Sequence, residues 1–206
     1  MGFFVVTNGC DILRKKQNMN IRDLYGIDDY DFLFVFVGNV NTNKNQKQVV
    51  DSFALLHKEI QLHIKILFVG GGEYHKLEKY IGDKNLSDSL FVHGPIDKGN
   101  VHNIYIAADA TILTSLSEGF GLSIIEGFVY GKPNLTFSDL PAVHDLYNPE
   151  CMLLCENRHD KTLADKLVEM TKTKWNKDFI IDYARKFSFE QMGKNYNFLY
   201  TAIKDK

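Results

Sequence analysis

Short apolar segments alternate with longer helical patterns along most of this 206-residue chain. The apolar segments are "DFLFVFVG" (31–38), "LHIKILFVGGG" (62–72), "DSLFVHG" (88–94), "DATILTS" (109–115), "KPNLTFS" (132–138) and "CMLLC" (151–155). Strands that are apolar on both faces and are separated by helices are typical of a parallel sheet covered on each side. The sequence therefore predicts an α/β fold, a Rossmann-like doubly wound parallel sheet of about six strands with helices on both faces.

The predicted helices fill the intervals between these strands and then continue to the end of the chain. They cover residues 45–60, 73–81, 100–108 and 121–131, followed by a tail over 160–206 without strand signals. Within the tail, "SFEQ" (188–191) matches a helix capping box. One apolar stripe then runs along the last helix through Phe189, Met192, Tyr196, Leu199 and Ile203.

Composition excludes several classes of function. The chain is 45% hydrophobic, enough for one substantial core, and its 24 basic and 26 acidic residues give a net charge of −2. A protein that mainly binds nucleic acid usually has a basic surplus, so we expect no nucleic-acid partner. The longest apolar run is too short to cross a bilayer, and there is no signal-peptide pattern. Three cysteines without close pairing indicate a reducing compartment, so we expect a cytoplasmic protein.

Ligands of a doubly wound sheet bind beyond the C-terminal ends of its strands, so the loops that follow the strands carry the candidate site. The first strand ends in Gly38 and Asn39, and Lys44 stands at the start of the next helix. A helix N-terminus and a lysine both attract anions. The loop is not a Walker loop, because no Gly precedes Lys44 and no Ser or Thr follows it. A solvated surface lysine remains the alternative.

Glycines also follow the second and third strands. Residues 70–72 are "GGG", but His75 occupies the last position of a dinucleotide-binding glycine fingerprint, which favours a tight, closely packed turn instead. In "HGPI" (93–96), Gly94 can present backbone groups to a flat base. Each of these two signals is weak by itself.

The fourth loop carries the strongest signal. Glu118 is followed by Gly119 and Gly121, and then by an apolar helix that contains Glu126. Glycines let backbone N–H groups approach a ligand, and N–H groups at a helix start suit a diphosphate. A carboxylate inside an apolar helix needs a partner. Glu126 is either a ligand for a pair of sugar hydroxyls or an internally paired group bonded to backbone or to a lysine.

The same loop resembles a known family motif. "E-G-F-G-L-x-x-x-E", with seven residues between Glu118 and Glu126, is similar to the E-x7-E motif of retaining glycosyltransferases of the GT-B fold, family four (glycosyl transferases group 1). The resemblance extends over nearly the whole chain. It includes "NGCD" (8–11), similar to the interdomain "NGVD", then "FVGNVNTNKN", "ILFVGGG", "LFVHG", "AADATILTS" and "GKPNLTF" in family order, and "FSFEQMGKNYNFLY", similar to the closing helix.

The resemblance implies roles for particular residues. Glu126 is expected to bind the nucleotide ribose and Glu118 the transferred sugar, while the backbone of Phe120, Gly121 and Leu122 meets the diphosphate or the sugar. Lys44 is expected to contact the phosphates and to assist the leaving group. The expected donor-binding set is Gly38, Asn39, Lys44, Gly94, Glu118, Gly119, Phe120, Gly121, Leu122 and Glu126, with Glu118 and Lys44 as its catalytic members.

The resemblance also implies how the chain is organised. Residues 1–30 are expected to be the remnant of an interdomain linker, 31–187 a nucleotide-sugar-binding domain, and 188–206 a helix that packs towards a missing N-terminal acceptor domain. The expected partners are a nucleoside diphosphate sugar and that acceptor domain, with no cofactor and no metal, and peripheral membrane association of the full protein stays open. The fragment alone is expected to transfer no sugar.

One departure from the family pattern matters. The family usually has an Arg where this chain has Asn39, and Asn donates hydrogen bonds but carries no charge. This favours one rival function, a module that binds a nucleotide or a sugar phosphate without catalysis. A second rival, a dinucleotide-dependent oxidoreductase, is disfavoured by the broken glycine fingerprint.

Overall fold

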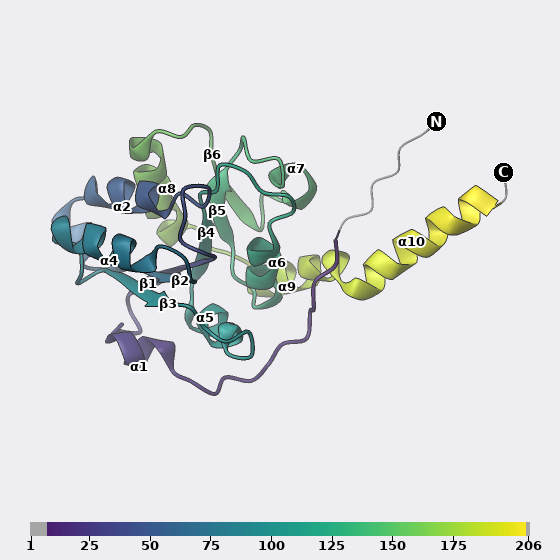
Figure 1. The fold of residues 1–206 in the computed structure, drawn as a ribbon, viewed down its shortest axis with the longest axis horizontal. Helices are drawn as coiled ribbons and strands as arrows, with labels where there is room; N and C mark the ends of the chain where they lie inside the picture. The colour runs from purple at the N-terminus through teal and green to yellow at the C-terminus, as the bar shows by residue number, and fades with distance from the viewer. Residues whose placement is uncertain (1–7, 205–206) are drawn as a thin grey trace.

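A six-stranded parallel sheet forms the centre of the molecule, as the sequence predicts (Figure 1). The computed structural model describes residues 8–204. The strands are β1 (Phe32–Val37), β2 (Ile64–Val69), β3 (Leu90–Gly94), β4 (Ala110–Leu113), β5 (Asn134–Phe137) and β6 (Met152–Cys155). Their order is β3-β2-β1-β4-β5-β6, so the direction of chain progression reverses between β1 and β4. This reversal is the point where doubly wound sheets bind ligands.

Helices cover both faces of the sheet (Figure 1). Helix α1 (Ile21–Tyr25) precedes β1, and α2 (Gln46–Ala54), α3 (Lys58–Gln61), α4 (Tyr74–Asp83), α5 (Val101–Ala107) and α6 (Leu122–Val129) follow the first four strands. The later ones are α7 (Val143–Leu146), α8 (Asp160–Lys172), α9 (Lys177–Ala184), the 3-10 turn η1 (Arg185–Phe187) and α10 (Phe189–Lys204). Within residues 8–204, none of the helices is both long enough and apolar enough to cross a membrane.

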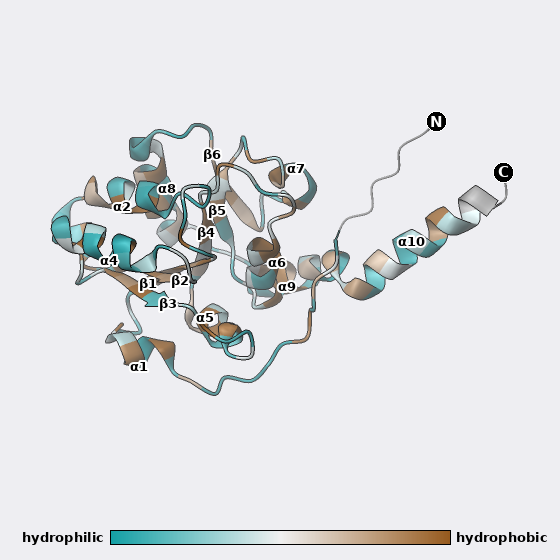
Figure 2. Ribbon diagram, viewed as in Figure 1, coloured by the Kyte–Doolittle hydropathy of each residue, from teal (hydrophilic) through white to brown (hydrophobic). Residues whose placement is uncertain are grey.

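Alternate residues of β1 build the two halves of the core. Phe34 and Phe36 pack in the cluster that contains the buried side chains of α2, α4 and α8. Leu33 and Val35 point to the other face, where the cluster includes residues of α1 and α5. All four side chains are fully buried, because a strand side chain alternates between two covered faces. In Figure 2 the central strands β1 and β2 are largely hydrophobic, whereas the outer helix α4 is largely hydrophilic.

The single helix predicted over 45–60 is two helices in the structure. Helix α2 ends at Ala54, and the chain extends at His57 before α3 begins. The side chain of Gln61 stabilises this break: its Nε2 donates to the carbonyl oxygens of Phe53 at 3.2 Å and Leu56 at 2.9 Å. A buried side chain thus replaces the helical bonds that the break removes, a contact that helical periodicity does not reveal.

The N-terminal segment of the described chain pairs with the residues at the start of α10. Cys10 N donates to Phe187 O at 2.7 Å, and Phe189 N donates to Cys10 O at 3.3 Å. Of the two hydrogen bonds of the predicted capping box, the one from the backbone to the cap side chain is present: Gln191 N donates to the hydroxyl of Ser188 at 3.1 Å. These bonds fix the start of α10 against the segment that enters the domain.

Helix α10 extends away from the body of the domain (Figure 1). Phe189, Phe198 and Tyr200 on this helix are 57%, 74% and 64% exposed. Few tertiary contacts therefore oppose its local opening.

We expect amide hydrogens in residues 190–201 to exchange much faster than those of α8, whose Leu163, Leu167 and Met170 are fully buried. Hydrogen exchange followed by mass spectrometry checks this, with α8 as the internal reference. Equal protection of the two helices in a sample shown to be monomeric would contradict it.

Candidate functional site

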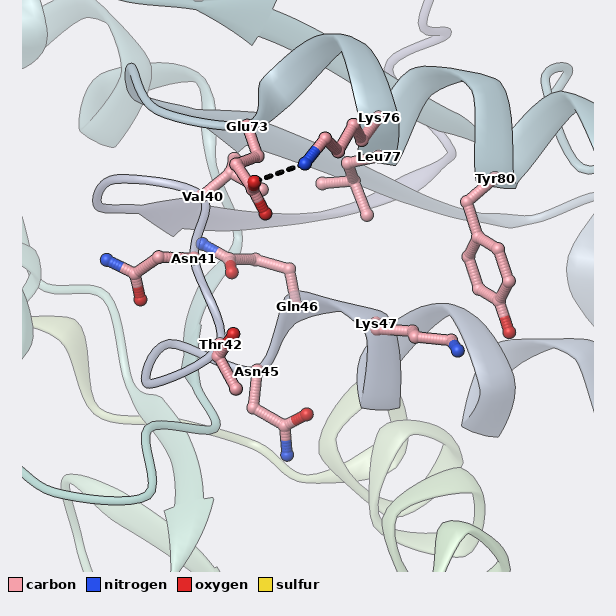
Figure 3. Close-up of a pocket in the computed structure, with 10 residues that line it drawn as sticks. All are labelled: Val40, Asn41, Thr42, Asn45, Gln46, Lys47, Glu73, Lys76, Leu77 and Tyr80. Carbon is pink, nitrogen blue, oxygen red and sulfur yellow. Dashed lines mark hydrogen bonds and ion pairs between the residues drawn. The ribbon is translucent and has the colours of Figure 1, made fainter.

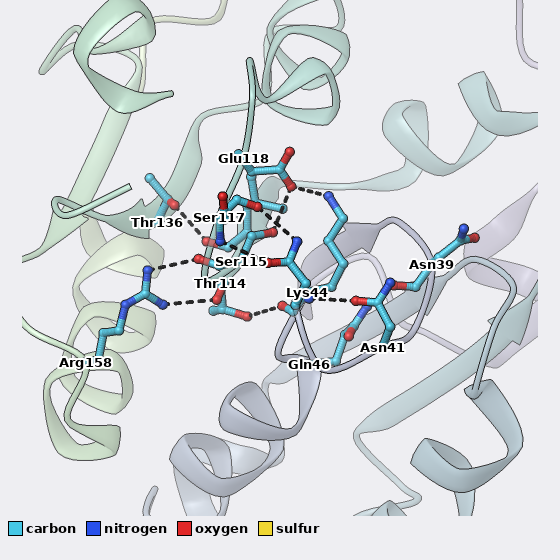
Figure 4. Close-up of polar contacts among 12 residues, drawn as sticks. Asn39, Asn41, Lys44, Gln46, Thr114, Ser115, Ser117, Glu118, Thr136 and Arg158 are labelled. Carbon is cyan, nitrogen blue, oxygen red and sulfur yellow. Dashed lines mark hydrogen bonds and ion pairs between the residues drawn. The ribbon is translucent and has the colours of Figure 1, made fainter. Parts of the chain in front are cut away.

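The loops that follow β1 and β4 are bonded directly to each other (Figure 4). The hydroxyl of Thr114, fully buried, donates to the carbonyl oxygens of Lys44 and Asn45, at 3.0 Å to each. Leu116 N donates to Asn43 O at 2.7 Å, and the Asn43 side chain bonds both the amide nitrogen and the carbonyl oxygen of Ser117. The two loops therefore form one connected unit at the reversal point of the sheet.

Arg158, which lies just before α8, supports the β4 loop from the other side. Its guanidinium donates to Thr114 O at 3.2 Å and to Ser115 O at 2.9 Å, and pairs with Asp139 at 2.8 Å. The guanidinium also lies 4.5 Å from the centre of the Phe137 ring. Sequence reasoning missed Arg158, because a lone arginine between β6 and α8 shows no motif.

The structure brings Lys44 and Glu118 into contact (Figure 4). The ammonium of Lys44 forms an ion pair with Glu118 Oε1, and the hydroxyl of Ser115 donates to the same oxygen at 2.8 Å. The two charged side chains are only 21% and 14% exposed. Lys44 and Glu118, 74 positions apart in the sequence, thus form a largely buried ion pair. The ammonium can also bind an anionic ligand, which then competes with the carboxylate.

The N-terminus of α6 lies directly after Glu118. Gly121 is the N-cap, with a φ of 78°, and no side chain caps the first turn. A Cβ on Gly119 would meet no atom within 4 Å, so the backbone is open at that position. Phe120 packs its ring edge-on against Phe187, at 6.2 Å between ring centres, so only its backbone can face a ligand, whereas Leu122 is 47% exposed. Uncapped N–H groups at a helix start suit an anion.

Gly38, Asn39 and Gly94 lie at the ends of the neighbouring strands. Gly70 N donates to Gly94 O at 2.8 Å, and a Cβ on Gly70 would collide with the carbonyl of Gly38. The glycine run after β2 therefore allows the ends of β1, β2 and β3 to pack closely. This is the tight, closely packed turn that the sequence predicts. The carbonyl of Asn39 accepts a bond of 3.0 Å from Nε2 of the buried Gln46.

A cavity of about 340 Å³ lies beside the β1 loop (Figure 3). It lies between the start of α2 and α4, and its lining includes Asn41, Gln46, Lys47, Lys76 and Tyr80. None of the predicted site residues lines it. We therefore place the candidate site where the β1 and β4 loops meet and not in this cavity.

Glu126 lines a pocket of about 280 Å³ that Lys44 and Glu118 do not line. Its Oε2 accepts a hydrogen bond of 2.6 Å from the hydroxyl of Tyr105 on α5. Tyr105 is 2% exposed and stacks on Tyr130, with 6.0 Å between the ring centres. The alternative of an internally paired Glu126 is thus realised in part, with a tyrosine in place of backbone or lysine. Among the described residues, no donor bonds its second oxygen, Oε1.

Burial governs the titration of Glu126. Desolvation raises the pKa of this carboxyl above its ordinary value of 4.5, while the Tyr105 hydrogen bond and the positive charge of Lys98 oppose the rise. Tyr105 was not among the predicted site residues. A tyrosine between the apolar Ile104 and Ile106 is the signal that points to it, since a buried hydroxyl needs a partner.

The comparisons with known proteins show the family of this chain. The family model for "Glycosyl transferases group 1" matches residues 17–187, most of the chain. The chain belongs to the glycosyl transferases group 1 family. Among curated members, it is 28% identical over 117 residues to the putative glycosyltransferase EpsD of Bacillus subtilis, covering 57% of this chain and 30% of that protein. It is 24% identical over 180 residues to the N-acetyl-alpha-D-glucosaminyl L-malate synthase of Bacillus anthracis, covering 86% and 46%.

Solved glycosyltransferases share the fold. The Anabaena HepE structure in complex with UDP-glucose aligns with a TM-score of 0.77 at 18% identity, covering 96% of this chain and 57% of that one. At this identity the likeness shows the fold alone. The chain spans about half or less of the length of the relatives it matches.

Replacing Tyr105 with Phe removes the hydroxyl that stabilises ionised Glu126. We expect the pKa of Glu126 to rise further and the free energy of unfolding at neutral pH to fall by about 1.5–3 kcal/mol, the scale of a hydrogen bond to a charged group. A carboxyl with a raised pKa in the folded state stabilises the fold at low pH, and this contribution is lost as pH rises. The loss in Tyr105→Phe should therefore be larger at pH 7.5 than at pH 4.

Urea denaturation at the two pH values measures this difference. Tyr130→Phe is the matched control, because the Tyr130 hydroxyl accepts a bond of 3.2 Å from the neutral backbone amide of Lys15. Its loss should be smaller and equal at both pH values. A pH-independent loss in Tyr105→Phe would contradict a role in stabilising the Glu126 carboxylate.

Proposed function

We propose that this chain is the donor-binding half of a retaining glycosyltransferase. Its substrate is a nucleoside diphosphate sugar, from which the sugar passes to an acceptor hydroxyl. The observation that carries the proposal is the contact of Lys44 with Glu118 beside the uncapped start of α6, because it places a cation, a carboxylate and free N–H groups at one edge of the sheet. UDP-glucose in the HepE complex supports this donor class.

Each group of the site takes a part of the donor. The diphosphate lies at the start of α6, where the N–H groups of Gly121 and Leu122 and the ammonium of Lys44 meet its charge. The free oxygen of Glu126 accepts from a ribose hydroxyl, while Tyr105 holds the other oxygen. Gly38, Asn39 and Gly94 form the neighbouring wall, beside the base and the phosphates.

The reaction breaks the bond between the anomeric carbon of the sugar and the diphosphate oxygen, and forms a bond from that carbon to the acceptor oxygen. The acceptor hydroxyl loses its proton, which leaves with the nucleoside diphosphate. Negative charge develops on the departing diphosphate, and Lys44 with the α6 N-terminus stabilises it. Glu118 accepts from hydroxyls of the sugar. These groups supply the charge without a metal or another cofactor. The acceptor site belongs to another domain, consistent with relatives about twice as long as this chain, so this chain alone transfers no sugar.

Asn39 supports a second candidate function, a binding module without catalysis. It stands where the family pattern has an arginine, and its side chain is exposed at the site. With one formal cation at the loop instead of two, stabilisation of the leaving group is weaker.

The two glutamates should respond differently to nucleotide and to nucleotide sugar. Glu126→Ala is expected to weaken UDP binding by about 1.5–3 kcal/mol, roughly tenfold or more in Kd, since a hydrogen bond to a charged group is lost. Glu118→Ala should not weaken UDP binding, because it releases Lys44 from its ion pair, but it should weaken UDP-glucose binding relative to UDP. Isothermal titration calorimetry with a panel of nucleoside diphosphates measures both effects.

Melting curves of the same variants are the control for folding. Glu126→Gln keeps an acceptor for Tyr105 and separates lost ligand contacts from lost packing. A Glu126→Ala protein that is less stable but keeps its nucleotide affinity would show that Glu126 is structural and not a ribose ligand.

Restoring the arginine tests the effect of Asn39. We expect Asn39→Arg to tighten UDP binding several-fold, up to about tenfold, because a second cation then faces the diphosphate. Asn39→Gln is the matched control, since it lengthens the side chain without adding charge. Equal affinities of the Arg and Gln variants at low ionic strength would place residue 39 away from the phosphates.

A further inference from the structure

A third pocket, away from the Lys44–Glu118 pair, is lined mostly by cations. It has a volume of about 350 Å³, and we call it the basic pocket. Its lining residues are Arg14, Lys15, Lys16, Ile106, Tyr130, Lys132 and Lys177. They come from the entering segment, α5, the connection between α6 and β5, and α9. No acidic residue lines it.

The charge of this pocket is not balanced within the described part of the chain. Nine other lysine and arginine side chains form ion pairs with acidic residues of the described chain, but the five cations of the basic pocket form none. The chain as a whole has a net charge of −2, so a surplus of positive charge does not explain the cluster. Five cations around one hollow repel one another, and a bound anion would relieve that repulsion.

Backbone contacts fix the position of the three consecutive basic residues. Lys15 N donates to the Tyr130 hydroxyl at 3.2 Å, and the carbonyl of Lys16 lies 3.0 Å from Nε2 of the buried His102. The segment is therefore held to α5 and to the end of α6. A preformed arrangement of cations binds an anion at a lower entropic cost than freely moving side chains.

Lys132 contributes a half-buried ammonium. It donates to the carbonyl oxygens of Ile106 and Ala108 at the C-terminal end of α5, which favours a cation there. An ammonium has three N–H donors, so one remains for a ligand. Desolvation, and secondly the positive charge of Lys177, lower the pKa of Lys132 to about 8. The negative charge of Asp109 opposes this fall in pKa but does not offset it.

We propose that the basic pocket is a binding site for a phosphate-bearing anion. Lysine and arginine together, with several donors converging on one hollow, match the oxygens of phosphate groups. The volume accommodates a group of the size of a diphosphate or a phosphorylated headgroup. The site is distinct from the proposed donor site, because Lys44, Glu118 and Glu126 do not line it, although Tyr130 and Lys15 also line the Glu126 pocket.

Inorganic pyrophosphate is the probe. All titrations use the full chain with Lys44→Ala, which weakens binding at the donor site. Two-dimensional NMR should show shifts of the amides of residues 14–16, 132 and 177. A double variant, Arg14→Gln with Lys16→Gln, removes two exposed charges and should weaken pyrophosphate binding at these residues by about tenfold. The matched control, Lys79→Gln with Lys174→Gln, removes two exposed charges elsewhere and should leave the affinity unchanged.

A second arm distinguishes the source of the phosphate. Co-sedimentation is measured with vesicles of phosphatidylglycerol and phosphatidylcholine, and with phosphatidylcholine alone. Binding to the anionic vesicles that is lost in the Arg14/Lys16 double variant identifies a lipid headgroup, whereas pyrophosphate binding without vesicle binding identifies a soluble phosphate compound. Both outcomes support the site.

Two results would overturn the proposal. One is a set of NMR shifts confined to residues 119–123, at the start of α6, with none at 14–16. The other is equal binding of pyrophosphate and anionic vesicles by the double variant and by its charge-matched control. Melting curves of both double variants show that each remains folded, since all four substituted side chains are exposed.

Discussion

The parallel pairing of β1 with β4 is the constraint on which the rest of the site depends. Phe34 pairs with Ala110 and Val35 with Thr111, although 76 positions separate each pair in the chain. This pairing brings the two following loops together, and the buried Thr114 hydroxyl then joins them through two carbonyl oxygens of the β1 loop. Without the pairing of β1 with β4, the fold would not bring Lys44 and Glu118 into contact.

The charged groups of the candidate site have polar partners within the chain itself. Glu118 holds Lys44, and the Tyr105 hydroxyl holds one oxygen of Glu126. A half-buried charge is stable only with a partner, so these contacts keep the site folded in the absence of a ligand. They also set a condition on any ligand: an anion at Lys44 has to compete with a carboxylate that is already in place.

The segment that enters the domain connects features that are far apart in the sequence. It pairs with residues 187–189 at the start of α10, lines the Glu126 pocket, and supplies three of the five cations of the basic pocket. Movement of this segment would therefore change both pockets together. Family membership places the chain among glycosyltransferases.

The sequence alone determined the sheet, because strands buried on both faces leave an apolar run such as "FLFVFV" that no surface strand shows. It also indicated Lys44, Glu118 and Glu126, through loop chemistry and the E-x7-E resemblance. The tertiary structure decided their partners: Ser115 and Lys44 for Glu118, Tyr105 for Glu126, and Arg158 behind the β4 loop. Periodicity and motifs report which face of an element is buried, but a hydrogen-bond partner 21 or 43 positions away is selected only when packed helices and paired strands bring the two groups together.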